Sequence, residues 1–272
     1  MTRGALLFAF NSPKYDYYAM AEATAKRINH FLDLPVTVVT NKESIPQNPK
    51  YLFDKVIVTT ADKSNKRDWG MWINKGRYQA FEFSSYDETL LLDTDYLVNS
   101  STLLQTFDLP TDFCCHDTTS FLMYPDAVQE VLSVYSFNTL WATVVNFKKT
   151  KRTEQIFGCL EMVQKNFEHY ANIHGFIHNT FRNDYALTLA LRIVNGHTVD
   201  NADVIPWNLL HSGTKNIHLY ANNDSDINTE YTVLFDNWSR GKLRKEYMII
   251  KDTDVHIMNK DNFLELICPA DS

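Results

Sequence analysis

Two aspartates that directly follow an apolar run have the types and spacing best suited to chemistry. Residues 89–99 read TLLLDTDYLVN, so Asp93 and Asp95 come after three leucines and are separated by one residue. The leucine run indicates a strand covered on both faces, and in such sheets ligands sit at the carboxyl ends of the strands. Because side chains alternate along an extended strand, both carboxylates should project to one side, roughly 7 Å apart at their backbones, with Thr94 pointing away. Two carboxylates so placed can hold a hard divalent cation and, through it, a diphosphate.

The Asp-x-Asp spacing by itself is weak evidence. It recurs in two other pairs, Asp224 with Asp226 and Asp252 with Asp254. A sequence of this length and aspartate content should contain on the order of two such matches by chance. Only the first pair follows a strand apolar enough to be central, whereas the polar run 222–228 indicates a surface turn. A helix cap or turn is the structural alternative for Asp93, but the apolar pattern resumes at 96–98 and favours the metal interpretation.

Composition places the chain among globular proteins. With 272 residues, 44% of them hydrophobic and 13% aromatic, it can form one large α/β domain or two small ones around a substantial core. The apolar start is short for a signal peptide, and no run approaches the roughly 20 apolar residues of a membrane helix. The cysteines fit neither a zinc spacing nor a disulfide framework, which predicts a reducing cytoplasm. They are Cys114, Cys115, Cys159 and Cys268.

Several enzyme classes lack their sequence signatures here. Only eight glycines occur and no two are separated by a single residue, so there is no dinucleotide-binding G-x-G-x-x-G and no P-loop. The G-x-S-x-G nucleophile elbow and the H-E-x-x-H zinc helix are also missing. The net charge of -7 argues against indiscriminate nucleic-acid binding, although basic runs occur at 148–152 and 240–245. Such runs are usually solvated faces.

The first part of the chain predicts an α/β beginning. An apolar strand at 5–10 leads through Asn11 into a helix, for which Ser12 is the predicted cap and Pro13 the first residue. β-branched strands are expected at 36–39 and 55–59. A helix at 69–83 should then precede the leucine strand. On that helix, Lys75 and Arg77 could face a phosphate or simply face water.

Strands and helices continue to alternate downstream. Strands are expected at 112–116 and 140–147, and helices at 126–135 and 153–170. The 140–147 strand, LWATVVNF, carries Trp141 and Thr143. A further helix should begin near Asn183, with Gly196 as its stop signal. Asp184 stands at the start of this helix, where a charge that favours the helix dipole is the simpler interpretation.

The last seventy residues predict short strands and loops that complete one mixed α/β domain. No linker separates them from the rest, so they should fold back over the sheet. A strand at 254–258 carries His256, and Lys260 follows four residues later. A lone histidine in an apolar strand is usually structural.

In order and spacing, these motifs resemble those of a known family. FAFN ends the first strand, Lys75 and Arg77 precede LLLDTDYLV, and LWATVVNF, FRNDYAL and H-x-x-x-K follow. Along nearly the whole chain this pattern resembles glycosyltransferases of the GT-A fold, in particular the glycogenin-like and bacterial galactosyltransferase-like group. The resemblance implies a single α/β domain over 1–272, with a mixed, mostly parallel sheet flanked by helices. Its nucleotide-binding half would be 1–100 and its acceptor-binding half 101–272.

The resemblance also implies a donor site. The donor would be a nucleotide-diphosphate sugar, a UDP-sugar, held through Mn²⁺ or Mg²⁺. Asp93 would lie near the ribose and the metal, Asp95 would bind the metal directly, and His256 would be the third ligand. Mixed imidazole and carboxylate ligands favour Mn²⁺. The other donor-binding candidates are Lys260, which would meet the diphosphate, and Arg77, Lys75 and Asn11.

Asp184 would match an acidic residue of the family near the transferred sugar, as its catalytic residue. Here the sequence departs from the family, because Tyr185 replaces a glutamine and the glycine-rich strand reads Ala142, Thr143, Val144. This departure puts the catalytic role of Asp184 in doubt. The acceptor would be positioned by side chains that suit sugars or bases, namely Trp141, Thr143, Trp207 and His211.

The acceptor and the class of activity stay open. A glycan, a small molecule or modified DNA could accept the sugar, since the Gly-poor, Asn- and Tyr-rich style is similar to glycosyltransferase-like proteins of tailed phages. Some of those decorate hydroxymethylated cytosine, and a phage protein would act in the host cytoplasm. The two basic runs would then meet DNA phosphates near one rim of the pocket. A nucleotidyltransferase and a catalytically silent carbohydrate- or partner-binding protein are the alternatives; the sequence predicts no membrane contact and leaves the oligomeric state open.

Overall fold

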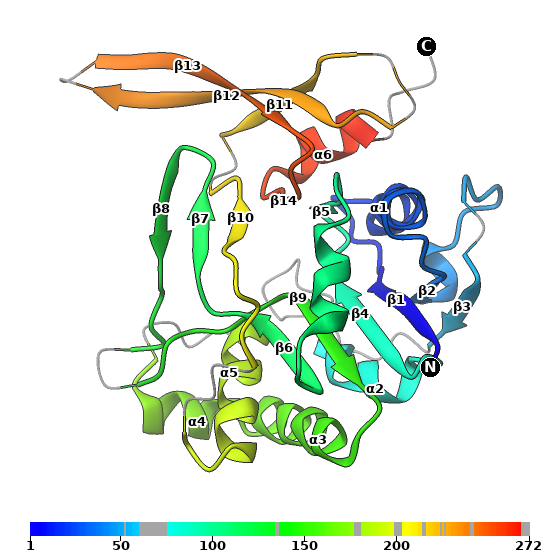
Figure 1. Cartoon of the computed structure of the whole chain (residues 1–272), viewed down its shortest axis with the longest axis vertical. Coiled ribbons are helices and arrows are strands. Elements are labelled where there is room, and N and C mark those ends of the chain that lie inside the picture. The colour runs from blue at the N-terminus through cyan, green and yellow to red at the C-terminus, as the bar shows by residue number, and fades with distance from the viewer. Residues whose placement is uncertain are drawn as a thin grey trace.

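A six-stranded sheet forms the centre of the molecule (Figure 1). The computed structural model describes the chain except residues 52, 60–74, 134–135, 177–180, 199–202, 214–215, 224, 226, 240–241 and 268–272. The strand order is β3 (Lys55–Val58), β2 (Val36–Thr40), β1 (Arg3–Phe8), β4 (Glu88–Leu92), β9 (Trp141–Lys148) and β6 (Phe113–His116). The first four are parallel, while β9 runs antiparallel between β4 and β6. The predicted mixed, mostly parallel α/β sheet is confirmed.

Helices cover both faces of this sheet. Helix α1 (Tyr17–Leu32) packs on one face, and α3 (Lys151–Lys165) and α5 (Asn183–Val194) pack on the other. Alternate residues of β1 enter the two cores, Leu6 on the α3 and α5 side and Leu7 on the α1 side. All five residues of β4 are buried, which explains why its sequence shows no polar alternation.

A second sheet joins segments that are far apart in the sequence. Its order is β5 (Tyr96–Leu97), β14 (Val255–His256), β10 (Leu209–His211), β7 (Thr119–Phe121) and β8 (Tyr124–Val128). His256 pairs with Tyr96 on one side and with His211 on the other. This pairing brings the late strand β14 directly to the end of β4.

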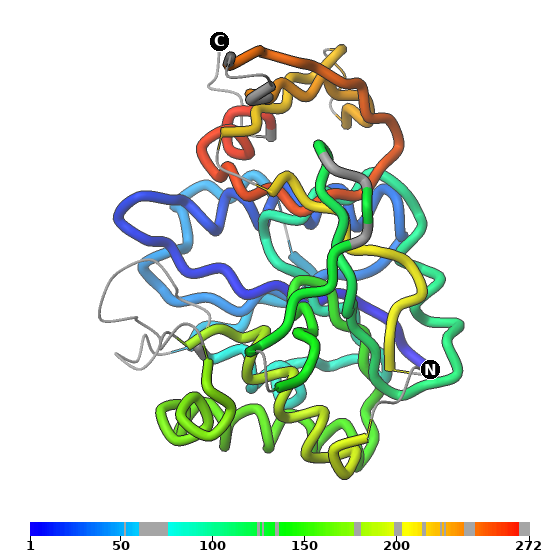
Figure 2. The backbone as a smooth tube through the Cα atoms, turned by 90° about the vertical axis from the view of Figure 1, so that its left-hand side faces the viewer, coloured from blue at the N-terminus to red at the C-terminus, as the bar shows by residue number. Residues whose placement is uncertain are grey.

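The C-terminal part forms a third sheet at one end of the molecule. Its strands are β11 (His218–Ala221), β12 (Glu230–Ser239) and β13 (Lys242–Lys251), and helix α6 (Lys260–Ile267) packs against β11. Figures 1 and 2 show this sheet at the end opposite to α3 and α4 (Phe167–His174). Within the described ranges, no helix combines the length and the apolar character that crossing a membrane requires. The other helical segments in the described part of the chain are η1 (Lys42–Ser44), η3 (Lys75–Gln79), α2 (Ala80–Phe83) and η4 (Thr102–Asp108).

The first helix begins later than predicted. Asp16 is its N-cap, and the Asp16 carboxylate accepts a hydrogen bond of 2.9 Å from the Ala19 N–H. The Ser12 hydroxyl instead accepts from the Tyr15 N–H (2.9 Å) and closes a turn before the helix. The prediction of Ser12 as the cap was wrong because two residues here can cap, and the turn commits Ser12 elsewhere.

Other helix predictions were altered by long-range pairing or by local breaks. The predicted helix at 126–135 is wrong, because β8 folds back and pairs with β7 as a hairpin. The predicted helix at 153–170 is divided at Asn166, which has a φ of -116° and donates its side-chain N–H to the Met162 carbonyl (2.8 Å). Of the predicted helix at 69–83, residues 69–74 lie outside the described residues and the rest forms η3 and α2.

We expect the buried His116, at the end of β6, to make the stability of the fold depend on pH. Its side chain is 1% exposed, and neither ring nitrogen has a partner among the described residues. Burial lowers the His116 pKa to about 3. Because the unfolded chain binds this proton near pH 6.5 and the folded chain does not, stability is lost as the pH falls from about 6.5 towards 3, at about 1.4 kcal/mol per pH unit.

We expect the His116→Leu variant to lose less stability on acidification. Between about pH 6.5 and pH 5 its free energy of unfolding should fall by about 2 kcal/mol less than that of the unchanged protein. Urea unfolding at a series of pH values measures the difference. Parallel pH profiles for the two proteins would show that His116 is not the group responsible.

Candidate functional site

The chain turns at Asp93 instead of continuing as a strand. The Asp93 N–H donates to the Thr143 carbonyl of β9 (3.0 Å), and the Tyr96 N–H donates back to the Asp93 carbonyl (3.2 Å). The expectation that extended alternation points Thr94 away is therefore wrong. Asp93, Thr94 and Asp95 all line one cavity, of about 230 Å³.

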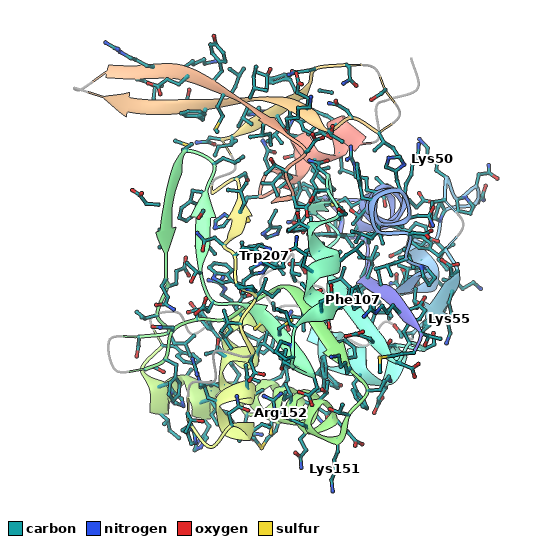
Figure 3. The ribbon with its side chains drawn as sticks, in the orientation of Figure 1. Lys50, Lys55, Phe107, Lys151, Arg152 and Trp207 are labelled. Carbon is teal, nitrogen blue, oxygen red and sulfur yellow. The ribbon has the colours of Figure 1, made fainter. Side chains whose placement is uncertain are left out.

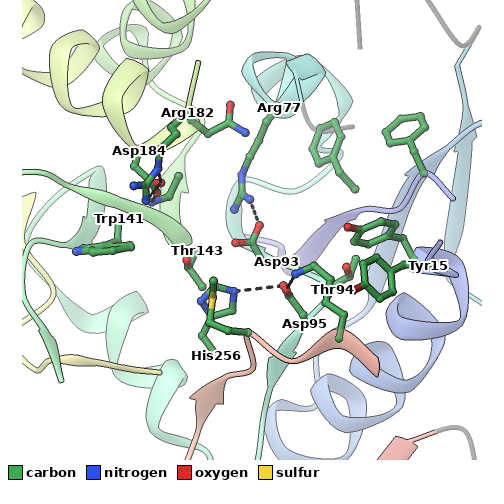
Figure 4. Close-up of a pocket in the computed structure, with 17 residues that line it drawn as sticks. Tyr15, Arg77, Asp93, Thr94, Asp95, Trp141, Thr143, Arg182, Asp184 and His256 are labelled. Atoms are coloured by element: carbon green, nitrogen blue, oxygen red, sulfur yellow. Dashed lines mark hydrogen bonds and ion pairs between the residues drawn. The ribbon is translucent and has the colours of Figure 1, made fainter. Parts of the chain in front are cut away.

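Asp93, Asp95 and His256 come together in this cavity (Figure 4). Each offers one ligand atom, and these atoms lie within 4.8 Å of one another; the searched part of the chain holds no other such group. The Nε2 atom of His256 is 3.3 Å from Oδ1 of Asp95. Two carboxylates and an imidazole are a donor set that divalent transition metals accept. The residues present therefore fit a metal ion.

Two cationic side chains hold the carboxylates. Lys260, the first residue of α6, bonds to Asp95, and Arg77 of η3 bonds to Asp93. The Arg77 side chain is 4% exposed, and its Nε and Nη2 atoms have no partner among the described residues. Lys75 begins η3, and its side chain lies outside what the structure describes.

Burial and neighbouring charges oppose each other at these groups. Burial raises the pKa of Asp93, and the Asp95 charge adds to this effect, so together they outweigh Arg77. Burial also acts against ionisation of Asp95, but Lys260 and His256 outweigh it and hold the Asp95 pKa below its ordinary value. For His256, burial lowers the pKa, but the Asp95 carboxylate raises it by more, so the pKa lies above its ordinary value. A metal ion needs the neutral imidazole, so a metal ion and a proton would compete for His256.

The cavity extends to both sides of this cluster. Tyr15 lies on one side, and Trp141, Arg182 and Asp184 lie on the other (Figure 4). Asp184 uses both carboxylate oxygens: Oδ1 accepts from the Ala142 N–H (2.9 Å), and Oδ2 accepts from Nε (3.2 Å) and Nη2 (2.9 Å) of Arg182. Asp184 also stands in the first turn of α5, where a negative charge favours the helix dipole. Its catalytic role stays a prediction.

The residues predicted to meet the acceptor lie at different depths. Trp141 and Thr143 line the cavity. His211 is not among the lining residues; its ring centroid is 5.8 Å from that of Trp141 and 6.4 Å from that of His256. Burial lowers the His211 pKa to about 4, and the Gly213 N–H donates to its Nδ1 atom (3.1 Å). Trp207 also lies outside the lining and packs near His116, with ring centroids 6.3 Å apart.

Asn11, predicted to bind the donor, is occupied in the fold. Its side-chain oxygen accepts from the Tyr18 N–H (2.9 Å) at the start of α1, and its own N–H donates to the Ser44 hydroxyl (2.7 Å). Asn11 is not among the lining residues.

Several lining residues were missed from the sequence. Arg182 is one of them; its guanidinium lies 5.7 Å from the centroid of the Trp141 ring. Its position immediately before the predicted helix at Asn183 was an available signal, because residues at a helix start often line a site. Tyr15 and Tyr17 follow β1, the strand next to β4, so their place near the carboxyl end of a central strand was also a signal.

The two basic runs do not share one rim, so that expectation was wrong. Figure 3 shows Lys151 and Arg152 at the α3 end of the molecule, and Figure 1 places β12 and β13 at the opposite end. Arg152 is bound by Asp112 and by Asp203, the latter at 2.6 Å. Charges spent on internal partners are not available for phosphates. Residues 240 and 241 of the second run lie outside the described residues.

Comparison with known proteins finds similar solved structures only. No family model and no curated protein sequence matches the chain. The chain is similar to the apo form of the glycosyltransferase GlyE of Streptococcus pneumoniae TIGR4, with 14% identity, a TM-score of 0.40, and coverage of 74% of this chain and 46% of that one. A second GlyE structure gives 15% identity, a TM-score of 0.39, and coverage of 70% and 43%. The galactosyltransferase LgtC, in complex with donor and acceptor sugar analogs, is 12% identical with a TM-score of 0.46. The match covers 69% of this chain and 70% of the LgtC chain.

This chain therefore spans less than half the length of the GlyE chains that it matches. At identities and TM-scores this low, the likeness assigns neither an activity nor a substrate to the chain.

We expect Asp95→Asn to abolish Mn²⁺ binding without unfolding the protein, because it removes a charge and no volume. His256→Ala should weaken Mn²⁺ by about 10- to 100-fold, as is typical of damaged metal shells. Electron paramagnetic resonance of free Mn²⁺ measures both, and circular dichroism checks the fold. Asp252→Asn, in an Asp-x-Asp pair that lines no part of this cavity, is the matched control and should bind as the unchanged protein does. Equal Mn²⁺ affinity in Asp95→Asn and Asp252→Asn would rule out the metal site.

Proposed function

We propose that the protein is a metal-dependent glycosyltransferase that moves a sugar from a nucleotide-diphosphate sugar, a UDP-sugar, to a hydroxyl acceptor. The observation that carries this proposal is one cavity, at the carboxyl end of β4, that collects a metal-binding donor set and two cations. Asp93, Asp95 and His256 supply the ligands, and Arg77 and Lys260 supply the cations. Mn²⁺ suits a mixed imidazole and carboxylate set better than Mg²⁺ does.

The charge of the cavity suits a diphosphate. Its three cationic lining residues balance its three carboxylates when His256 is neutral; they are Arg77, Arg182 and Lys260 against Asp93, Asp95 and Asp184. A divalent ion would leave the cavity positive by the charge of that ion alone. The two phosphates of a nucleotide-sugar, each with one ionised oxygen, match this surplus. A nucleoside triphosphate carries more charge and is commonly handled by a pair of metal ions, which favours sugar transfer over nucleotidyl transfer.

Each group then has a role in the transfer. The metal ion would neutralise the charge that develops on the leaving diphosphate. Lys260 and Arg77 donate charge-assisted hydrogen bonds to the phosphate oxygens. On the other side of the cluster, Trp141 and Thr143 form the wall that meets the acceptor, with Asp184 facing the transferred sugar. His211 packs against this wall, with its ring centroid 5.8 Å from that of Trp141.

Within the proposed single domain over 1–272, both halves of the chain contribute residues to the donor site. The half 1–100 provides the two aspartates and Arg77. His256 and Lys260 come from the half 101–272, so both halves build the donor site. Donor binding should therefore raise the free energy of unfolding of the whole domain.

The acceptor that fits these observations is a hydroxyl of a glycan or small molecule. Hydroxymethylated cytosine in DNA would need a continuous basic surface beside the cavity. Lys151 and Arg152 lie at the α3 end of the molecule and β13 lies at the opposite end, so these parts of the two basic runs do not form one continuous surface.

A donor screen tests the proposal. Hydrolysis of UDP-, GDP- and dTDP-sugars with Mn²⁺ should release nucleoside diphosphate from one donor class, because water replaces the acceptor. A chelator and Asp95→Asn should each abolish the release, while Asp252→Asn should not. Turnover of nucleoside triphosphates instead would favour a nucleotidyltransferase. Binding of sugars with no turnover of any donor would favour the silent binding protein.

A charge-reversal variant tests the acceptor. Changing the exposed Lys151, Arg244 and Lys245 to Glu should leave the rate of sugar transfer unchanged at low and physiological salt. Loss of transfer to hydroxymethylated DNA, with donor hydrolysis intact, would restore DNA as the acceptor.

A further inference from the structure

Each of the two carboxylates suited to a metal ion already carries a cation. Lys260 bonds to Asp95, and Arg77 bonds to Asp93. The side chains of Lys260 and Asp95 are 23% and 7% exposed, so their charges meet largely out of water. An ion pair in such surroundings is held more firmly than one on the surface. A metal ion that approaches Asp95 therefore meets a competitor.

Lys260 and a divalent ion cannot share Asp95 without cost. Oδ2 of Asp95 faces the Lys260 ammonium, and Oδ1 faces His256 at 3.3 Å. An ion held by Asp95 and His256 would lie within a few ångströms of the ammonium, since the three ligand atoms lie within 4.8 Å of one another. Repulsion between the two positive charges is strong at such distances. The ammonium has to turn away for the ion to be held well.

The unpaired donors of Arg77 indicate which kind of ligand would bind the cations of the cavity. Its Nε and Nη2 atoms are buried and have no partner among the described residues, although the side chain lines the cavity. Buried donors without partners destabilise a fold, so these positions match oxygens that a ligand brings. A phosphate group presents oxygens to the fork of a guanidinium. Lys260 lines the same cavity and can reach the same ligand.

We propose that Lys260 is a stand-in for the metal ion, and that metal binding exchanges it from Asp95 to the diphosphate. This inference rests on the proposed function, because it takes the diphosphate as the ligand. Metal and diphosphate then bind cooperatively. The metal ion frees the cation that the diphosphate needs, and the diphosphate draws away the cation that competes with the metal. By linkage, each must raise the affinity of the other by the same factor.

Removing the stand-in should move the two affinities in opposite directions. In Lys260→Met, Mn²⁺ alone should bind about 10-fold more tightly than in the unchanged protein, because its competitor is gone. UDP measured with saturating Mn²⁺ should bind about 10-fold more weakly, because a phosphate partner is gone. Electron paramagnetic resonance measures Mn²⁺, and titration calorimetry measures UDP.

Two further variants control for charge. Lys260→Arg keeps the positive charge and should bind Mn²⁺ nearly as the unchanged protein does. Lys165→Met removes an exposed charge that pairs with Glu161 at 2.8 Å, and it should leave both affinities unchanged. If Lys260→Met does not fold, the unchanged protein still provides a test. Its Mn²⁺ affinity with and without UDP must differ, and its UDP affinity must respond to Mn²⁺ by the same factor.

The failures are distinguishable. Mn²⁺ binding to Lys260→Met that is no tighter than to the unchanged protein, or equal Mn²⁺ affinity with and without UDP, overturns the exchange and leaves the proposed function standing. Absence of Mn²⁺ binding in both the unchanged protein and Lys260→Met removes the metal site, and with it the proposed function.

Discussion

The site exists because of the pairing between two very short strands. β5 and β14 contribute two residues each, yet their pairing sets His256 beside Asp95 across most of the length of the chain. The Ile257 N–H donates to the Asp95 carbonyl (2.9 Å), which extends the pairing past the strand. Asp254 adds two further bonds, accepting from the backbone N–H groups of Asn99 (2.7 Å) and Ser100 (2.8 Å). Together with the pairing of His256 to His211 in β10, these bonds fix the register of β14 and so determine where His256 lies.

The same pairing creates an electrostatic problem that shapes the rest of the cavity. Asp93 and Asp95 are close, and burial acts against ionisation of both. When two carboxylates share a site, ionisation of both is unfavourable unless nearby cations offset their repulsion. Arg77 and Lys260 do so from opposite parts of the sequence, one before β4 and one at the start of α6. The chain itself thus supplies a cation to each of the two carboxylates.

The central sheet and the position of Asp93 and Asp95 at a strand end could be predicted from local patterns, whereas His256 was expected beside them only through the resemblance to a known family. The leucines before Asp93 mark a buried strand, and the H-x-x-x-K spacing places Lys260 on the first turn after β14. Features set by distant partners could not be predicted. The helix expected at 126–135 does not form, because β8 pairs with β7 as a hairpin. The two basic runs are far apart because α3 covers the central sheet, whereas β13 belongs to the third sheet at the other end of the molecule. The pairing of Arg182 with Asp184 was likewise invisible, since side-chain geometry decides it.

Two aspartate pairs with the same spacing show why position in the fold, and not the motif, decides what a carboxylate does. Oδ1 of Asp254 is held by two backbone N–H groups, and these donors cannot move away without breaking the chain path. Oδ2 of Asp95 is held by the ammonium of a lysine, at the end of a side chain with four rotatable bonds. A carboxylate bound by backbone is committed to structure, whereas one bound by a mobile cation can exchange its partner. That difference in the mobility of the donor, which no sequence spacing records, separates the structural aspartate from the one available to a metal ion.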